Sequence, residues 1–195
     1  MVRELSDRLA RVATRWRGED YYAAQYQEMH AHGAFPGKSW EHHVDTLCRV
    51  VPDVGQKTVL DFGCGPLGGL AARLGERVIS YDPFVEKYST PPWDKRFDGV
   101  FSSDVLEHMT AKQIEDFLSH VAAARPDFVF LNVSTRPAFK NLPNGANAHL
   151  TVKPGDWWLQ YVGEKMGPEY KPLLAQVDLL SSEVTLCLRR GAGPR

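Results

Sequence analysis

The stretch of this chain that most clearly indicates chemistry is an apolar run ending in an acid and a glycine-rich turn. Residues 58–61 read Thr-Val-Leu-Asp, and glycines follow at positions 63, 65 and 68. A strand, a tight turn and a helix start with this glycine spacing are typical of nucleotide-binding sites. Asp61, however, stands two residues before the first glycine, where its charge would oppose a pyrophosphate that helix N-termini otherwise attract. The pattern favours a cofactor with a cationic amino-acid end and no phosphate.

A second carboxylate follows at the distance that a ribose requires. Residues 78–81 read as a short buried strand, and Asp82 comes directly after it, 19 positions beyond Gly63. An acid about 20 residues past the glycine turn can accept hydrogen bonds from ribose hydroxyls. A third motif, residues 97–109, reads as a strand whose polar end opens into a helix.

Together and in this order, the three motifs make the chain similar to the class I S-adenosylmethionine-dependent methyltransferases. The resemblance covers residues 58–133, and the run from Asn144 to Trp158 is similar to small bacterial and phage members. It implies S-adenosylmethionine as cofactor and methyl transfer as activity. It implies cofactor binding by the residues around the three strand ends: Asp61, Gly63, Cys64, Gly65, Tyr81, Asp82, Pro83, Ser102, Ser103 and Asp104.

The predicted fold class is α/β, with a Rossmann-like, doubly wound and mostly parallel sheet. Strands are expected at residues 58–61, 78–81, 100–102 and 128–133, and an antiparallel hairpin at 174–180 and 184–188 closes the sheet. Thr110 and Gln113 form a capping box that predicts a helix start. Only 14 residues separate Asp82 from Phe97. A βαβ crossover needs about a dozen residues besides its strands, so the third strand of the family is expected to be shortened or missing. The family's acid for the adenine amino group then has no counterpart, and Phe84 with backbone near 102–104 is the expected substitute.

Additions flank this core. Leu5, Leu9, Val12 and Trp16 follow helical spacing, and residues 21–29 and 40–51 are further helical candidates. We expect a single methyltransferase domain over residues 1–195, with a helical lid at 1–52 and the Rossmann-like core at 53–190.

Two histidines are the catalytic candidates, because a hydroxyl nucleophile needs a base with a pKa near 7. His108 follows the third motif and either caps and packs or touches the ligands. His149 lies in a polar loop, where a base or a substrate ligand is the more natural role.

The expected substrate-binding residues come from the aromatic helix, the end of the fourth strand and the segment after it: Tyr22, Tyr26, His30, Asn132, Arg136, Lys153 and Trp157. Arg136 suits a carboxylate or phosphate, although an ordinary surface arginine is an equal alternative. One of Trp157 and Trp158 is expected to pack inward. Histidines 30, 32, 42 and 43 lack a matching ligand set, so no metal is expected.

The composition and charge of the chain limit the kinds of molecule that it is expected to bind. The chain has 195 residues, 43% of them hydrophobic, and a formal net charge of −1. This balance allows one substantial core and provides no general basic field for nucleic acid. Three widely spaced cysteines and a charged N-terminus without an apolar core favour a reducing cytoplasm, no membrane anchor and no metal knot. Oligomeric state stays open.

Two functions are compatible with these patterns. The first is methyl transfer to an oxygen or nitrogen of a small acceptor, with sugars, nucleotide-linked compounds and other anionic metabolites among the candidates. The alternative is a methyltransferase-like cofactor-binding or accessory module without its own activity. A dehydrogenase conflicts with Asp61, and macromolecular methylation would require a basic groove that the sequence does not show.

Overall fold

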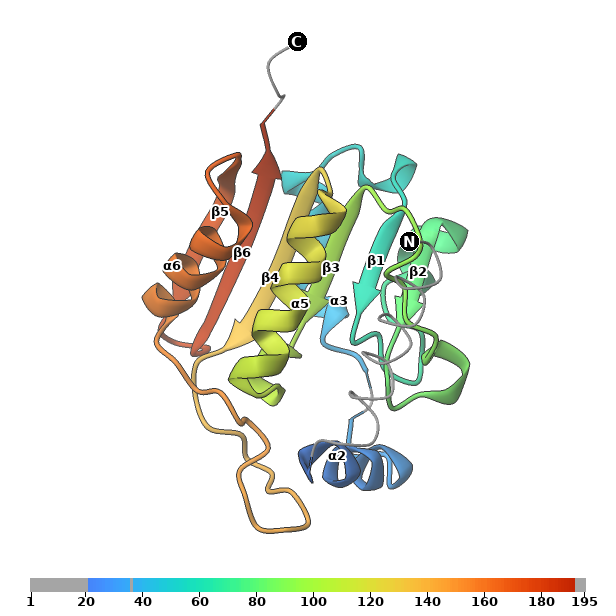
Figure 1. The fold of residues 1–195 in the computed structure, drawn as a ribbon, viewed down its shortest axis with the longest axis vertical. Helices are drawn as coiled ribbons and strands as arrows, with labels where there is room; N and C mark the ends of the chain where they lie inside the picture. The colour runs from blue at the N-terminus through green and yellow to red at the C-terminus, as the bar shows by residue number, and fades with distance from the viewer. Residues whose placement is uncertain (1–20, 36, 192–195) are drawn as a thin grey trace, which may run out of the picture.

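The computed structural model describes residues 21–35 and 37–191, and they form a mixed sheet flanked by helices (Figure 1). The helix expected through Leu5 and Trp16 lies outside the described residues. The helices are α2 (Tyr21–Ala31), α3 (Trp40–Val50), α4 (Ala71–Leu74), α5 (Ala111–Ala124) and α6 (Gly155–Met166). The strands are β1 (Val59–Phe62), β2 (Val78–Tyr81), β3 (Gly99–Ser103), β4 (Phe128–Ser134), β5 (Tyr170–Asp178) and β6 (Glu183–Arg190). Short 3-10 turns are η1 (Val54–Gln56), η2 (Gly75–Arg77), η3 (Glu86–Tyr88) and η4 (Leu106–His108).

The sheet has the order β2-β1-β3-β4-β6-β5. The first four strands are parallel, whereas β6 pairs antiparallel with both β4 and β5. This arrangement confirms the predicted mostly parallel sheet and its closing hairpin. It also confirms the missing third strand: β2 ends the sheet, and among the described residues between β2 and β3 the chain makes only η3.

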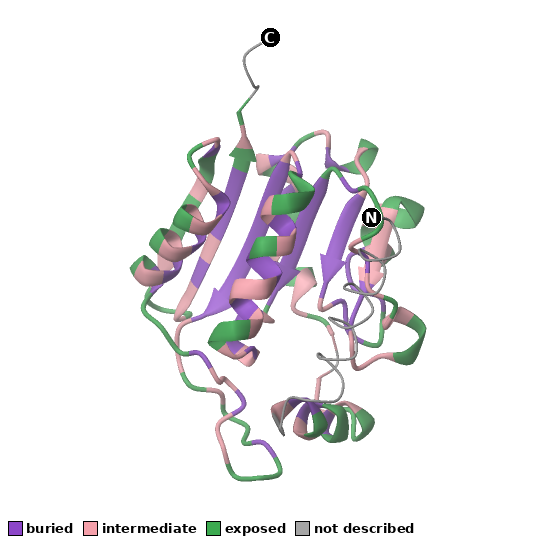
Figure 2. Cartoon of the chain, in the orientation of Figure 1, coloured by how far each residue is buried: buried purple, intermediate pink, exposed green. Residues whose placement is uncertain are grey.

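Each face of the sheet carries its own apolar core, because alternate residues of a strand point to opposite faces. Leu60, Val100 and Leu131 belong to the core beneath α5 and α6. Val59 and Phe130 belong to the core beneath α3, on the other face. The central strands are consequently buried on both sides, while the helices expose their outer surfaces (Figure 2).

Helix α5 begins as its sequence predicts. The Thr110 side chain accepts a hydrogen bond from the Gln113 backbone, and the Gln113 side chain accepts one from the Thr110 backbone. Each such cap contributes about 1 kcal/mol. The helix therefore starts directly after η4, and this fixes the end of the third motif.

Helix α6 was not predicted. Pro154 stands at its N-cap without a side-chain hydrogen bond, and Gly155 and Gly163 lower its intrinsic propensity. Burial of Trp158, Val162 and Met166, spaced four residues apart, stabilises it instead.

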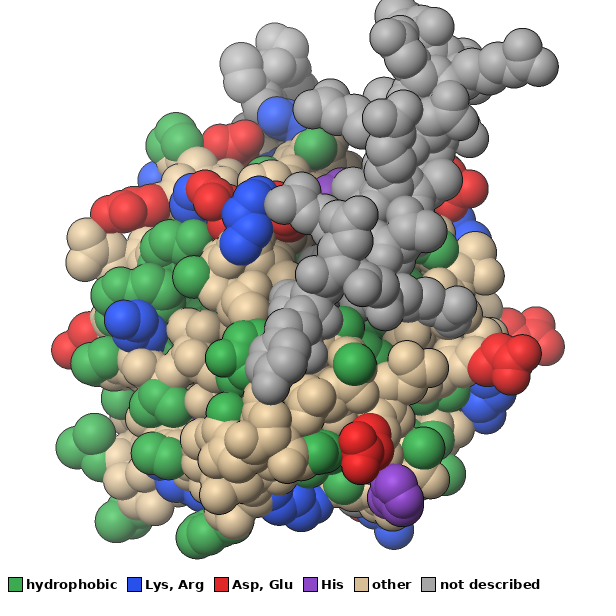
Figure 3. Space-filling model, turned by 60° about the horizontal axis from the view of Figure 1, so that its bottom comes forward, with side chains coloured by type: hydrophobic (Ala, Val, Ile, Leu, Met, Phe, Trp, Pro, Cys, Tyr) green, Lys and Arg blue, Asp and Glu red, His purple; other side chains and the backbone are tan. Residues whose placement is uncertain are grey.

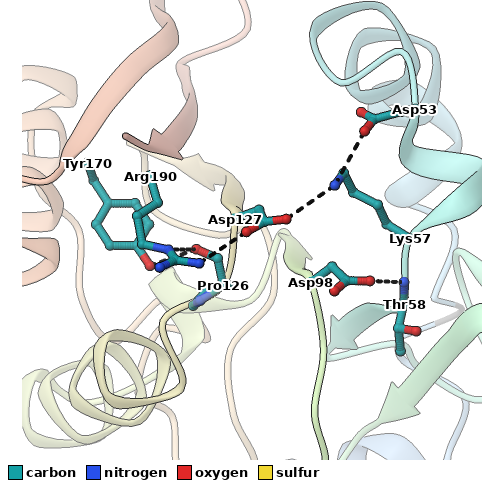
Figure 4. Close-up of polar contacts among 8 residues, drawn as sticks. All are labelled: Asp53, Lys57, Thr58, Asp98, Pro126, Asp127, Tyr170 and Arg190. Atoms are coloured by element: carbon teal, nitrogen blue, oxygen red, sulfur yellow. Dashed lines mark hydrogen bonds and ion pairs between the residues drawn. The ribbon is translucent and has the colours of Figure 1, made fainter. Parts of the chain in front are cut away.

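The amino end of the sheet is closed by polar contacts (Figure 4). Asp127 pairs with Lys57 at 3.2 Å and with Arg190 at 3.1 Å. Asp98 accepts a hydrogen bond from the Thr58 backbone at 2.8 Å. In the part of the chain that is described, no helix combines the length and the apolar character needed to span a bilayer.

Candidate active site

A cavity of about 490 Å³ lies at the opposite, carboxyl end of the parallel strands. Its walls come from the turns that follow β1, β2 and β3, from the end of β4, from α2 and from the loop between β4 and α6. Figure 1 shows α2 and this loop below the strand ends, far from the polar contacts of the amino end. Open α/β sheets bind ligands in this position.

The glycine turn forms one wall and requires glycine at two positions. Gly63 and Gly65 have φ values of +81° and +65°. A Cβ on Gly63 would lie 2.3 Å from Val105, and one on Gly65 would lie 2.7 Å from the Cα of Gly37. The Gly63 and Cys64 backbone N–H groups both donate to the Tyr81 carbonyl. The turn is therefore held between β2 and the loop at residue 37, with bare backbone facing the cavity.

Asp82 lines the same wall, as predicted for a ribose acceptor. Its two carboxylate oxygens accept hydrogen bonds from the backbone of Gly65 at 3.0 Å and of Phe84 at 2.9 Å. Burial raises the pKa of Asp82, and these backbone N–H groups and His30 oppose that rise. A carboxylate has about four acceptor sites, so roughly two stay available for hydroxyl donors.

Asp61 does not line the cavity, in contrast to its expected role at the cationic end of a cofactor. The side chain is buried, and its Oδ2 accepts a hydrogen bond from the Leu70 backbone at 2.7 Å. Burial raises the pKa of Asp61 to about 7. A Cβ on Gly69 would lie 2.2 Å from Oδ2, so Asp61 fixes the turn from within the protein.

Three other predicted cofactor residues also lie outside the cavity, whereas Pro83, Ser103 and Asp104 line it. Cys64, Tyr81 and Ser102 are buried in the protein. The Tyr81 ring packs against Phe62, and the Ser102 hydroxyl donates to the Phe62 carbonyl. Tyr81 and Ser102 lie in strands, and the alternation of side chains along these strands directs them inward. Cys64 lies in the turn after β1. The motifs alone do not define these directions.

His108 and His149, the predicted catalytic pair, meet in the cavity with ring centroids 4.7 Å apart. The Nδ1 of His108 lies 2.8 Å from the Ala148 carbonyl, and the Nδ1 of His149 lies 2.6 Å from the Arg136 carbonyl. A carbonyl oxygen only accepts, so each Nδ1 carries a hydrogen and Nε2 is the nitrogen of each ring that remains for a ligand. Burial lowers the pKa of His108 to about 4, which keeps this ring neutral.

Helix α2, part of the segment expected as a lid, contributes aromatic side chains to the wall of the cavity. Tyr22, Tyr26 and His30 on α2 all line the cavity. The Tyr26 hydroxyl donates to the Ala148 carbonyl, and the His30 ring lies 5.3 Å from the Phe84 ring. Helix α2 thereby connects the Asp82 turn to the loop that carries His149.

The remaining substrate candidates separate into two groups. Asn132 and Arg136 line the cavity. The Asn132 amide donates to Thr185 at 3.1 Å, and the Arg136 guanidinium lies 4.4 Å above the Phe139 ring. Lys153 and Trp157 lie outside the cavity, because α6 packs against α5 and the closing strands.

Trp157 stacks on Tyr161 of its own helix with centroids 4.6 Å apart, and Lys153 lies 5.6 Å above the indole. Trp158 is the inward-packing member of the pair.

Several cavity residues were not among the sequence candidates: Phe35, Lys38, Ser39, His42, His43 and Lys140. All but Lys140 come from α3 and the loop before it, where no motif marks them.

Glu107 was also missed as a buried acid. Its Oε1 accepts a hydrogen bond from the Ser134 backbone at 2.7 Å. Burial and then the charge of Asp104 hold its pKa well above the usual range. Its position beside His108 in the third motif is the sequence feature that could have indicated a role at the site.

Solved structures with a similar fold include three methyltransferases. One is the 1,6-didemethyltoxoflavin-N1-methyltransferase of Burkholderia thailandensis, solved with 1,6-didemethyltoxoflavin and S-adenosylhomocysteine. It matches with a TM-score of 0.56 at 16% identity, over 88% of this chain and 89% of its own. The magnesium protoporphyrin IX methyltransferase of Synechocystis PCC 6803, solved with S-adenosylmethionine, matches with a TM-score of 0.53 at 14% identity, over 78% and 79%.

An S-adenosylmethionine-dependent methyltransferase of Mesorhizobium loti matches with a TM-score of 0.50 at 15% identity, over 76% of this chain and 97% of its own. The chain has the class I methyltransferase fold. The fold that the three motifs predict is thereby confirmed. No protein-family model matches the chain, and no curated protein sequence matches it.

Proposed function

We propose that the chain transfers a methyl group from S-adenosylmethionine to an oxygen or nitrogen of a small, anionic acceptor. The observation that carries this proposal is the joining of two features in one cavity. The glycine turn and Asp82 form one wall, and the His108–His149 pair lies in the same space. The methyltransferases of the same fold that were solved with S-adenosylmethionine or its product support this choice of cofactor.

The residues present fit that cofactor. Gly63 and Gly65 line the cavity without side chains, so the glycine turn presents backbone to the cofactor. Asp82 keeps acceptor capacity for the two ribose hydroxyls, and Phe84 offers a ring face beside it for adenine. S-adenosylmethionine supplies, when bound, a methyl group on a positively charged sulfur. A cavity that contains Asp82 and Asp104 favours such a positive charge.

The acceptor side of the cavity combines aromatic walls with cationic residues. Tyr22, Tyr26 and Phe35 offer apolar surface, whereas Arg136 and Lys140 lie at the same cavity with positive charge. An arginine binds a carboxylate or phosphate through paired N–H donors. A planar or cyclic metabolite with one anionic group matches this lining.

Proton removal is assigned to His149. Its Nδ1 hydrogen is directed to the Arg136 carbonyl, and its Nε2 can accept the proton of an acceptor hydroxyl or amine. Orientation of the acceptor against the methyl group contributes up to about 7–11 kcal/mol in such displacements. Helix α2 contributes Tyr22, Tyr26 and His30 to the wall of this cavity.

A macromolecular acceptor is less compatible with the surface. Figure 3 brings the strand-end face forward, and its described Lys and Arg side chains are scattered among acidic and apolar ones. Nucleic-acid binding depends on a continuous basic area.

Two measurements test this proposal together. Calorimetry with S-adenosylmethionine and S-adenosylhomocysteine should show one binding site for each, with micromolar affinity as the expected range. Incubation with labelled methyl donor and pools of anionic metabolites should then label a small product. Binding without any labelled product would favour a cofactor-binding module, and no binding of either compound would refute the proposal.

A further inference from the structure

Three side chains with metal-ligating atoms converge in the cavity. Asp104 follows β3, His108 ends η4, and His149 comes from the loop between β4 and α6. Each offers one ligand atom, and these three atoms lie within 4.8 Å of one another. The sequence indicated no metal, because its histidine-rich segment, residues 30–43, lacks a ligand set. This second group becomes visible only when the loop places His149 against His108.

The hydrogen bonds of the two imidazoles match those of metal ligands. Both Nδ1 atoms are engaged with backbone carbonyls, at 2.8 Å for His108 and 2.6 Å for His149. A histidine that binds a metal through one nitrogen almost always donates its other N–H to a carbonyl or carboxylate. With Nδ1 engaged in this way, Nε2 is the nitrogen of each ring that remains to bind a metal ion.

The site contains a carboxylate as well as two imidazoles. Asp104 lines the cavity together with His108 and His149. Ligands of one ion bind at about 2.0–2.2 Å and so lie about 3–3.5 Å apart. The three ligand atoms lie within 4.8 Å of one another, so this spacing must shorten when an ion binds.

We propose that Asp104, His108 and His149 bind a divalent first-row transition-metal ion. Two imidazoles and one carboxylate suit zinc, iron or cobalt, and three protein ligands leave coordination positions open toward the cavity. The role of the metal ion in methyl transfer rests on the proposed function. The open positions would bind the hydroxyl oxygen of the acceptor and lower its pKa, and its proton would leave to bulk water. With a metal ion bound, the acceptor atom is oxygen, and His149 is a metal ligand. This role replaces the role of base that His149 has in the metal-free form of the proposed reaction.

The test measures metal binding directly. Protein treated with a chelator and then dialysed is titrated with Zn²⁺ in a calorimeter and with Co²⁺ while visible absorption is recorded. We expect one ion per chain, with cobalt absorption bands typical of a protein site. Asp104→Asn should weaken Zn²⁺ affinity at least tenfold, and so should His149→Ala.

Two variants keep the result interpretable. Asp104 is exposed and has a φ of +59°, a conformation that asparagine tolerates well, so Asp104→Asn should fold normally. His32 is exposed on the terminal turn after α2 and does not line the cavity, so His32→Ala controls for binding by surface histidines. Its Zn²⁺ affinity should equal that of the wild type.

Equal Zn²⁺ affinities in the wild type and Asp104→Asn would overturn the metal site, and so would the absence of stoichiometric binding. S-adenosylhomocysteine titrated into the same metal-free protein separates this inference from the proposed function. If S-adenosylhomocysteine binds and the metal does not, only the metal site is refuted. If the metal binds as expected and S-adenosylhomocysteine does not, the metal site stands and the proposed function falls.

Discussion

Aspartates lie at both ends of the parallel strands, but their surroundings differ. At the amino end, Asp127 is held by Lys57 and Arg190, and Asp98 is held by the Thr58 backbone (Figure 4). Those contacts join residues just before β1, β3 and β4 and the last residue of β6. At the carboxyl end, Asp82 accepts hydrogen bonds from the backbone N–H groups of Gly65 and Phe84 and faces a cavity.

The two ends differ in which polar atoms remain free to bind a ligand after the contacts within the protein are made. Charged pairs at the amino end neutralise one another at the surface, so they contribute to stability and leave no site. Backbone groups at the carboxyl end orient Asp82, His108 and His149 while leaving ligand-binding atoms free. A strand-end acid indicates a ligand site only when its partners are main-chain groups in a cavity.

The largest expected effect comes from Gly65→Ala. Its Cβ would lie 2.7 Å from the Cα of Gly37, so the glycine turn would have to move and the cofactor cradle would close. Calorimetry should show no measurable S-adenosylmethionine binding. Gly75→Ala is the matched control, because Gly75 also has a positive φ, +76°, but open space around its Cβ. Both variants carry about 1–2 kcal/mol of backbone strain, and only Gly65→Ala should lose the ligand. Equal losses would point to strain alone.

The next effect concerns turnover. His149→Ala should reduce kcat by about 100-fold or more, which is the usual contribution of a positioned proton acceptor or metal ligand. Affinity for S-adenosylhomocysteine should be preserved, because His149 lies on the acceptor side. His120→Ala provides the control, since His120 stacks on Trp93 away from the cavity. A fully active His149→Ala variant would remove this residue from the reaction.

A pH dependence of stability should follow from Asp61. Its pKa is raised from 3.8 to about 7 by burial, so the folded state holds the proton more tightly than the unfolded state. The resulting stability is complete below about pH 4 and is lost as the pH rises to 7. Urea unfolding should show wild type losing stability relative to Asp61→Asn over this range, on the order of a few kcal/mol. A constant difference between the two proteins would show that Asp61 ionises normally.

The smallest effect belongs to the amino end. Asp127→Ala removes two partly exposed ion pairs and should lower the free energy of unfolding by roughly 1 kcal/mol. S-adenosylmethionine affinity should not change. Asp116→Ala, which removes one exposed helix pair with Lys112, should cost only about 0.3–0.5 kcal/mol. A loss of cofactor binding in Asp127→Ala would contradict the separation between the two ends.

Local sequence patterns were sufficient to predict the central strands and the start of helix α5. Strand β2 falls at residues 78–81 as predicted, and the capping box starts α5 at Ala111. The short link from Asp82 to Phe97 correctly indicated the missing strand. Helix α6 was missed because packing stabilises it against poor propensity at Gly155 and Gly163.

The site was predictable where backbone motifs define it and less so where tertiary contacts do. Asp82 and Gly65 were found from spacing alone, and both line the cavity. The inward direction of Asp61 depends on side-chain alternation within a four-residue strand, which shifts with a one-residue change in register. Lys153 and Trp157 were placed at the site because α6 was not foreseen.

The central claim is that the carboxyl-end cavity binds S-adenosylmethionine, and calorimetry on two aspartate variants tests it most directly. Asp82→Asn removes a carboxylate at the cavity, whereas Asp98→Asn removes one that accepts from the backbone at the amino end. We predict that Asp82→Asn weakens S-adenosylmethionine binding at least tenfold and that Asp98→Asn leaves it unchanged. Equal affinities in both variants and the wild type would contradict the assignment of the cavity.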